Sequence, residues 1–168
     1  MSRVTLRQLY FVRFGFALAW AVLLFLTGAD LNPVSIALLV IYPLFDVAAA
    51  IVDLRANGSS PTLWANVAVS TLTAAGLAVA VTSGIPAVLG VWGAWAVAAG
   101  AIQLAVGLGR RALGGQWPMI ISGGQSVLVG GVFLLQLGAA NPMLTTLSGY
   151  ALLGGVYFLI SALRLRQS

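Results

Sequence analysis

The sequence has no cysteine, no histidine and no lysine, and charged residues make up only 7% of its 168 positions. Without cysteine and histidine the chain has no disulfide, thiol nucleophile, imidazole base or usual zinc ligand, so we expect no metal and no cofactor. A soluble domain carries roughly a quarter charged residues. Because 61% of the residues are hydrophobic and the mean hydropathy is +1.05, the composition predicts an integral membrane protein in a lipid bilayer.

Acidic residues are also scarce, with three against eight arginines, which gives a net charge of +5. A basic chain could bind nucleic acid, but this one has no basic run with interleaved aromatic residues, so we expect no nucleic-acid partner. Arginines that flank membrane spans set topology instead. The use of arginine alone, with abundant alanine, glycine and valine, favours a GC-rich bacterial genome, and hence a multi-pass protein of the bacterial cytoplasmic (inner) membrane.

Long apolar runs predict the fold class. A membrane-spanning helix needs about 20 mostly apolar residues, and turn residues separate the runs. Pro33, Pro86 and Pro142 are each expected at the N-terminal edge of a span, where a missing N–H costs little. We therefore predict an all-α polytopic protein with six transmembrane helices at about 10–28, 34–53, 63–83, 86–109, 118–138 and 143–163.

The arginines predict the orientation. With six spans they all fall on one side of the membrane, which predicts that both termini are cytoplasmic. The basic, then apolar, N-terminus also resembles a signal peptide, but its removal would break the repeat described next. The arginines are Arg3, Arg7, Arg13, Arg55, Arg110, Arg111, Arg164 and Arg166.

The turn prolines suggest an internal repeat. Pro33, Pro86 and Pro142 are 53 and 56 residues apart, and each unit ends in arginine. We predict one domain, 1–168, built from three tandem helical hairpins at about 10–55, 63–111 and 118–166. Each hairpin is expected to have a tight outer turn, and longer basic connections are expected on the inner side.

Small residues form stripes on two of the predicted helices, where they favour close helix packing or association with another copy or another membrane protein. On one helix glycine recurs every seven residues, and on the next a small residue recurs every four. The packing candidates are Gly93, Gly100 and Gly107 on the fourth span and Ser122, Ser126 and Gly130 on the fifth.

Asp46 is the most unusual residue, because an isolated carboxylate deep in a membrane costs about 2.5–3.5 kcal/mol. In the stretch "IYPLFDVAAAIVD" it shares a helical face with Tyr42 and Asp53. Asp53 lies at the inner interface, where Arg55, Arg110 or Arg111 can solvate it. Asp46 is expected past the midplane, with Arg13 at a matching depth in the preceding span.

We therefore predict an ion pair between Arg13 and Asp46, with two parallel hydrogen bonds. Tyr42, Asn66, Gln103 or Gln125 would satisfy the remaining oxygen lone pairs, and all of these polar groups except Tyr42 are expected in the cytoplasmic half. Pro43 precedes Asp46 by three residues and is expected to kink the helix and free the carbonyl of Leu39. The predicted intramembrane polar cluster is Arg13, Tyr42, Asp46, Asn66, Gln103 and Gln125.

Four stretches carry a resemblance to a known family. "YPLFD", "GAWAVAAGAIQL", "SGGQS" and "YFLISALRL" resemble the HdeD-like bacterial membrane proteins, over nearly the whole chain. The resemblance implies a six-helix bundle of paired-helix repeats. It also implies an association with acid or envelope stress, and it transfers no catalytic or binding residue.

Two functions remain open at this point. No paired carboxylates or phosphate-binding loop is present, and Ser122 and Ser126 have no apparent base, so we expect no enzyme. "GGQW" and "SGGQS" are expected to permit close packing. The first hypothesis is a non-catalytic bundle that acts through helix packing and partner or self association. The alternative is a small proton- or ion-coupled transporter or channel that uses Asp46.

Overall fold

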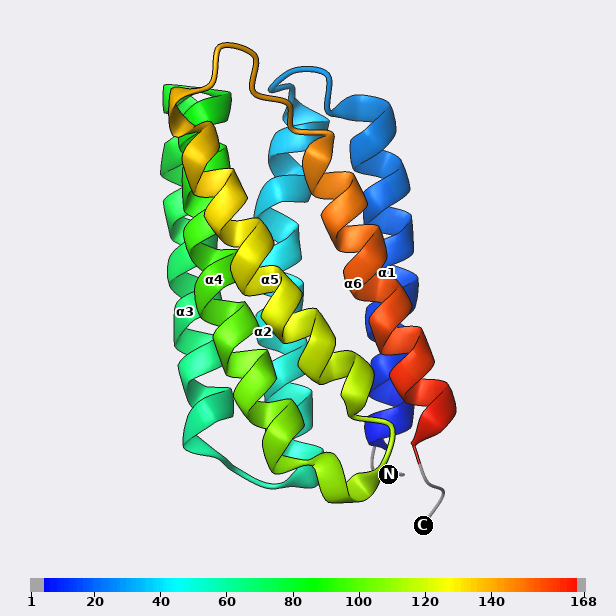
Figure 1. Cartoon of the computed structure of the whole chain (residues 1–168). Coiled ribbons are helices and arrows are strands. Elements are labelled where there is room, and N and C mark those ends of the chain that lie inside the picture. Colours follow the sequence, from blue (N-terminus) through cyan, green and yellow to red (C-terminus); the bar gives the residue numbers. More distant parts are fainter. Residues whose placement is uncertain (1–4, 166–168) are drawn as a thin grey trace.

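The computed structural model describes residues 5–165, so Arg3 and Arg166 lie outside the described residues. This part of the chain is helical without strands, and six of its helices are long and apolar enough to cross a membrane (Figure 1). The prediction of an all-α membrane protein with six spanning helices is confirmed. The helices are α1 Leu6–Thr27, α2 Pro33–Asn57, α3 Pro61–Ala80, α4 Ile85–Gly109, α5 Trp117–Leu135 and α6 Thr146–Arg164.

Polar caps and prolines explain where several helices begin. Asn32 accepts hydrogen bonds from the first free N–H groups of α2, and Ser60 does the same for α3. Pro33 and Pro86 lie in the first turns of α2 and α4, as predicted. The prediction for Pro142 is wrong: α6 begins at Thr146, because tight turns that include the bond from Leu147 N to Leu144 O precede it.

The lengths of the connections also differ from the prediction. Short 3-10 turns follow three helices, at Val81–Ser83, Arg111–Leu113 and Gln136–Gly138. The connection between α2 and α3, predicted as a longer inner one, is only residues 58–60, because both helices extend beyond the apolar runs that predicted them. The connection between α5 and α6, predicted as a tight outer turn, covers residues 136–145 and is the longest connection between the described helices. A tight outer turn and a longer inner connection are therefore not a general rule of this chain.

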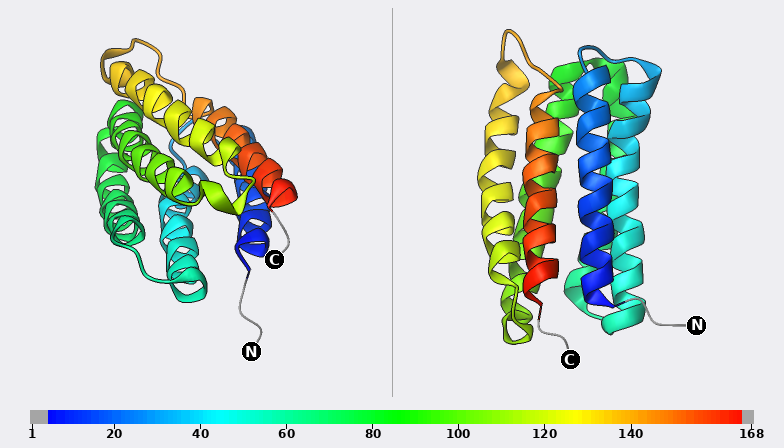
Figure 2. Two further views of the ribbon diagram at one scale, coloured as in Figure 1. Left: turned by 60° about the horizontal axis from the view of Figure 1, so that its bottom comes forward. Right: turned by 90° about the vertical axis from the view of Figure 1, so that its right-hand side faces the viewer.

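The six helices form a closed ring (Figure 2). Each helix packs on its neighbours in the sequence, and α6 closes the ring by packing on α1. Both described ends of the chain lie at the same end of the bundle as the α2–α3 and α4–α5 connections. The chain thus runs as three consecutive antiparallel hairpins, but the closest contacts, α4 on α5 and α1 on α6, join helices of different hairpins.

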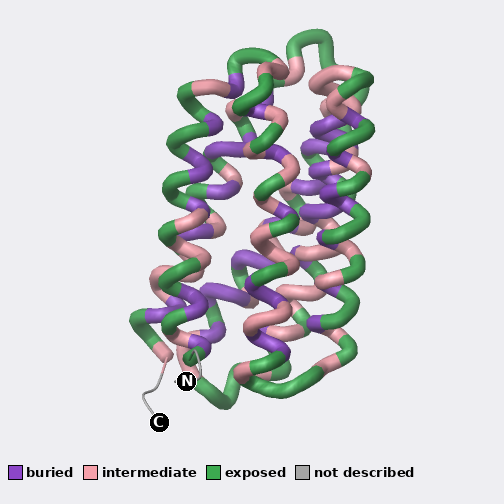
Figure 3. The backbone as a smooth tube through the Cα atoms, turned by 180° about the vertical axis from the view of Figure 1, so that it is seen from behind, coloured by how far each residue is buried: buried purple, intermediate pink, exposed green. Residues whose placement is uncertain are grey.

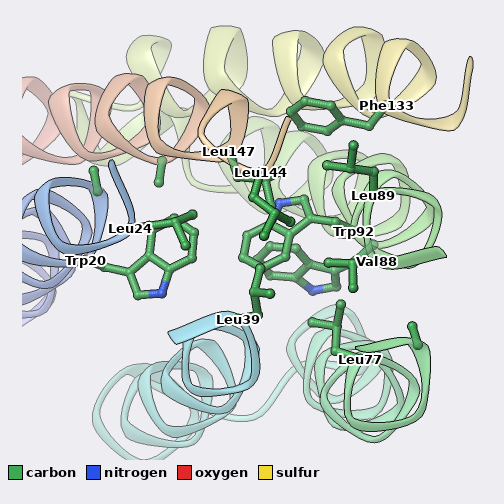
Figure 4. Close-up of a cluster of buried hydrophobic side chains, with 14 residues drawn as sticks. Trp20, Leu24, Leu39, Leu77, Val88, Leu89, Trp92, Phe133, Leu144 and Leu147 are labelled. Atoms are coloured by element: carbon green, nitrogen blue, oxygen red, sulfur yellow. The ribbon is translucent and has the colours of Figure 1, made fainter. Parts of the chain in front are cut away.

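A compact apolar core fills the half of the ring that holds the α1–α2 and α5–α6 connections (Figure 4). Trp20, Leu39, Trp92 and Leu147 meet there from four different helices and are almost completely buried. Large apolar side chains such as Leu72 point outward instead, and exposed residues cover the outer surface of the ring along its length (Figure 3). Such a surface suits a lipid bilayer, because lipid surrounds apolar side chains without cost. Lipid offers no hydrogen-bond partners, so each helix must satisfy its own backbone N–H and C=O groups.

Candidate functional site

Below the apolar core lies a cavity of about 340 Å³, which we call the polar cavity. Side chains from all six helices line it. The structure brings the whole predicted polar cluster to this cavity, together with Ser122 and Ser126, which were predicted only as packing residues. The six predicted residues are Arg13, Tyr42, Asp46, Asn66, Gln103 and Gln125.

Asp46 is the centre of a hydrogen-bond network. Arg13 Nη1 donates to Asp46 Oδ1 at 2.7 Å, which confirms the predicted ion pair. Asn66 Nδ2 and Ser70 Oγ donate to Oδ2 at 2.6 and 2.8 Å. Trp95 Nε1 in turn donates to Ser70 Oγ at 3.0 Å. The carboxylate therefore links α1, α2, α3 and, through Ser70, α4.

One detail of the Asp46 prediction is wrong. Arg13 makes one hydrogen bond to the carboxylate and not two, because Asn66 and Ser70 occupy the second oxygen. Asp46 is the fourteenth of the 25 residues of α2, because α2 extends four residues beyond the predicted boundary at 53. Its depth past the membrane midplane stays a prediction.

The other predicted partners do not contact Asp46 through hydrogen bonds. Gln103 Nε2 donates to the carbonyl of Met119, and Gln125 Oε1 accepts from the hydroxyl of Tyr157. Tyr42 packs among aromatic rings, with its ring centroid 4.6 Å from that of Trp20. These side chains share the cavity with Asp46 and shape its wall.

Aromatic side chains close the polar cavity toward the apolar core. Tyr42, Trp92 and Trp95 pack edge to face or tilted against one another. Aromatic pairs in these geometries contribute about 0.5–1.5 kcal/mol beyond their buried area, so they form a rigid boundary.

A second ion pair, between Asp53 and Arg110, lies outside the cavity lining, where α4 ends. Asp53 accepts two hydrogen bonds from Arg110, from Nη1 at 2.7 Å and from Nη2 at 2.9 Å, and a third from Asn57. Arg110 is thus the predicted arginine that solvates Asp53. Burial alone would lower the pKa of the Arg110 guanidinium, but the hydrogen bonds and negative charge of Asp53 raise this pKa above its usual value. The arginine therefore stays charged, and the pair joins the ends of α2 and α4.

The glycine stripes are used inside the bundle. A Cβ on Gly100 would lie 2.7 Å from Ser126 Cβ and 2.8 Å from the carbonyl oxygen of Gly123. Gly93 faces Gly130 across the same α4–α5 contact, and Gly107 faces Ile120. This confirms close helix packing at these positions, and it means that the stripes are not available to a second protein.

The two glycine-rich segments pack as expected. In "SGGQS", a Cβ on Gly123 would meet the backbone of Leu104 at 2.6 Å. In "GGQW", Gly115 has φ +63° and lies against the backbone at Arg164 and Leu165. Both segments bring backbones together, the second at the end of the ring where α5 begins.

Pro43 is buried, and α2 continues through it as one helix. The indole Nε1 of Trp20 donates to the carbonyl of Leu38 at 2.7 Å, in the turn before Pro43. The sequence pointed to the neighbouring carbonyl of Leu39 as the one in need of a donor. A side chain of α1 therefore supports the proline-containing turn and fixes the distance between α1 and α2.

Sequence reasoning missed several residues of the site. Ser70, which donates to Asp46, was not among the predicted partners, and the donor role of Trp95 was not foreseen. Tyr150 and Tyr157 of α6 donate to Ser126 and Gln125 of α5 and line the cavity. Their spacing of seven residues, two helical turns, was the signal that could have placed both tyrosines on one face.

The cavity offers hydrogen-bond donors and acceptors and one neutralised ion pair. Residues 5–165 contain no group of three side chains that could hold a metal ion. Comparison of the chain with protein-family models, curated proteins and solved structures finds no match.

Proposed function

We propose that this protein is a non-catalytic integral membrane protein that binds a small molecule in its polar cavity. The observation that supports the proposal is the cavity itself, because about 340 Å³ of space lies beside polar side chains within a bundle of apolar helices. Small-molecule sites typically measure about 300–1,000 Å³ and combine apolar walls with a few convergent polar groups. A bundle that only needed stability would fill this space.

Binding by the cavity takes the place of self association as the favoured function. The stripes that suggested an interface, such as Gly93 and Gly100, pack on α5 within the chain. The resemblance to HdeD-like proteins, and with it a role in acid or envelope stress, stays a prediction. So does the placement in the bacterial inner membrane.

Ala99 offers a direct test, because it lines the cavity and Ala101 on the same helix is exposed. The protein would be extracted into nanodiscs with its native lipids and weighed by native mass spectrometry. A retained small molecule in wild type and in Ala101→Leu, lost in Ala99→Leu, would support the proposal. A wild-type protein that retains nothing, under conditions that preserve the fold, would refute it.

Proton- or ion-coupled transport is the second candidate, and one observation favours it: Asp46 lines the cavity. Its carboxylate is already bound by Arg13, Asn66 and Ser70, which opposes exchange of an ion. Proteoliposomes loaded with a pH-sensitive dye would report proton movement. Transport requires a flux that Asp46→Asn abolishes, and binding alone predicts no flux in either protein.

The orientation in the membrane is a separate proposal, based on the arginines of one end of the bundle. A cysteine introduced at Ala140, in the α5–α6 connection, should react with an impermeant thiol reagent added outside intact cells. One at Ser59, in the α2–α3 connection, should react only after the membrane is opened. The reverse pattern would place the termini outside.

A further inference from the structure

The polar cavity reaches the surface of the bundle on one side. Of its described lining residues, the exposed ones are Thr146, Gly149 and Leu153, and all three belong to α6. A Cβ added to Gly149 or to Gly154 would meet no atom within 4 Å, so open space adjoins both positions. The cavity therefore opens beside α6, on a surface that faces lipid.

The helices beside this opening are loosely joined. α5 packs extensively on α4, and α6 on α1, whereas α5 and α6 contact each other much less. Two tyrosine hydrogen bonds cross from α6 to α5, Tyr150 to Ser126 at 3.1 Å and Tyr157 to Gln125 at 2.7 Å. The two ends of the cavity are better closed, by aromatic rings on one side and by the bond from Tyr10 to Gln116 on the other. Entry from the bilayer is the more open route.

Unused hydrogen-bond donors line the interior. Ser122 lines the cavity, and its hydroxyl makes no hydrogen bond to a described residue and is not sealed off from the cavity. Arg13 donates to Asp46 through Nη1 alone, and its Cζ lies 5.1 Å from the ring centre of Phe158. Gln125 accepts through Oε1, which leaves its Nε2 as a donor. A hydroxyl, a guanidinium and an amide N–H that open onto the cavity can donate to a molecule inside it, so a ligand with acceptor atoms would suit this wall.

The charge of the head group decides which ligands with acceptor atoms suit the cavity. Asp46 already neutralises Arg13, so an ionised head group would leave a net charge within the membrane, which is costly. A neutral carbonyl group accepts hydrogen bonds without adding charge. The cavity volume is near the lower limit for small-molecule sites, so it suits a head group whose apolar chain extends past α6 into lipid.

We propose that the polar cavity binds a neutral amphiphile from the bilayer. Its carbonyl head group accepts hydrogen bonds from Arg13, Ser122 and Gln125, and its apolar chain leaves between α5 and α6. This proposal rests on the proposed binding function and names the ligand class and its route. A quinone ring and an acyl ester share this chemistry, and the experiment separates them.

The test uses probes with matched dodecyl chains and the full-length protein in nanodiscs. Two neutral carbonyl probes, a dodecyl benzoquinone and a dodecanoyl glycerol ester, are compared with dodecyl phosphate, dodecyl trimethylammonium and dodecane. Native mass spectrometry measures their affinities, and diazirine versions of the chains locate them by crosslinking. We expect at least one carbonyl probe to bind more tightly than the ionic probes and dodecane, with crosslinks on α5 and α6. Whichever carbonyl probe binds more tightly, the benzoquinone or the glycerol ester, identifies the class of the natural ligand.

Two variants and one matched control sharpen the test. Gly149→Leu places a side chain at the opening and should weaken carbonyl-probe binding about tenfold, equivalent to about 1.4 kcal/mol. The matched change Gly15→Leu, at an exposed glycine of α1 with open space around it, should leave binding unchanged. Ser122→Ala should weaken the carbonyl probes but not dodecane. Both glycine changes meet open space, so the fold is expected to survive them.

The possible failures are distinct. Tighter binding of an ionic probe, lost in Ala99→Leu, would overturn the ligand class and leave the binding function standing. Crosslinks confined to α1 and α3, or equal binding by Gly149→Leu and wild type, would overturn the route between α5 and α6. If no probe binds and the wild-type protein also retains no native molecule, the proposed function fails as well.

Discussion

Removal of either Arg13 or Asp46 should destabilise the bundle, and removal of both should cost less than the sum of the two single changes. The prediction follows from the 2.7 Å contact between the two side chains, which are 15% and 13% exposed. Loss of one partner from a buried ion pair leaves an uncompensated charge and typically costs about 3–5 kcal/mol. Loss of both removes that penalty.

The network also predicts that the two single changes are unequal. In Arg13→Ala, Asp46 keeps the hydrogen bonds from Asn66 and Ser70, so we expect a cost of about 3 kcal/mol. In Asp46→Ala, three donors lose their acceptor, and a buried donor left without a partner costs about 1–3 kcal/mol. We therefore expect about 5 kcal/mol for Asp46→Ala and a coupling of about 1–3 kcal/mol between the positions.

The measurement is reversible unfolding of the four proteins of this cycle in mixed detergent micelles. The control cycle pairs Arg13→Ala with Asp53→Ala, because Asp53 lies about 10 Å further along α2 and pairs with Arg110. The control effects should add. If the Arg13 and Asp46 effects also add, or if Arg13→Ala costs more than Asp46→Ala, the proposed energetic role of the network is refuted.

Two other predictions concern packing and the inner ion pair. Gly100→Ala should destabilise the protein by about 1–3 kcal/mol, because its Cβ would overlap α5, whereas Gly15→Ala in open space should be neutral or stabilising; equal melting temperatures would show that the α4–α5 contact is not close. Arg110→Gln should cost about 3–5 kcal/mol, because it leaves the buried Asp53 carboxylate without its cation. The same change at the exposed Arg111 should have little effect, and equal losses at the two sites in a denaturation series would contradict this assignment.

The sequence alone determined the class of structure and the number of spans. Long apolar runs must be surrounded by lipid or buried in a core. Their length of about 20 residues matches the thickness of a bilayer, however the helices are arranged in the bundle. It also predicted the Arg13–Asp46 pair, because two helices joined by a short turn must place residues at equal distance from the turn beside each other. Scarcity of charge made this inference strong, since an isolated carboxylate in a membrane requires a partner.

The tertiary structure decided how the helices share their contacts. The stripes of small residues predicted close packing without naming the neighbour, and in the structure the glycines of α4 face α5, and α6 closes the ring against α1. Side-chain shape at each interface sets these pairings, and a stripe of small residues does not specify which neighbour it faces. The partners of Asp46 depended on the same pairings, so Ser70 could not be chosen over Gln103 or Gln125 from spacing alone.

The polar cavity also required the tertiary structure. The sequence placed its polar residues at similar depths, which identified Arg13, Asp46 and Asn66 as one group. Whether the space between them is filled or open depends on volumes contributed by all six helices, and on the loose contact between α5 and α6. No periodicity along one helix contains that information, because a cavity is a property of the gaps between helices.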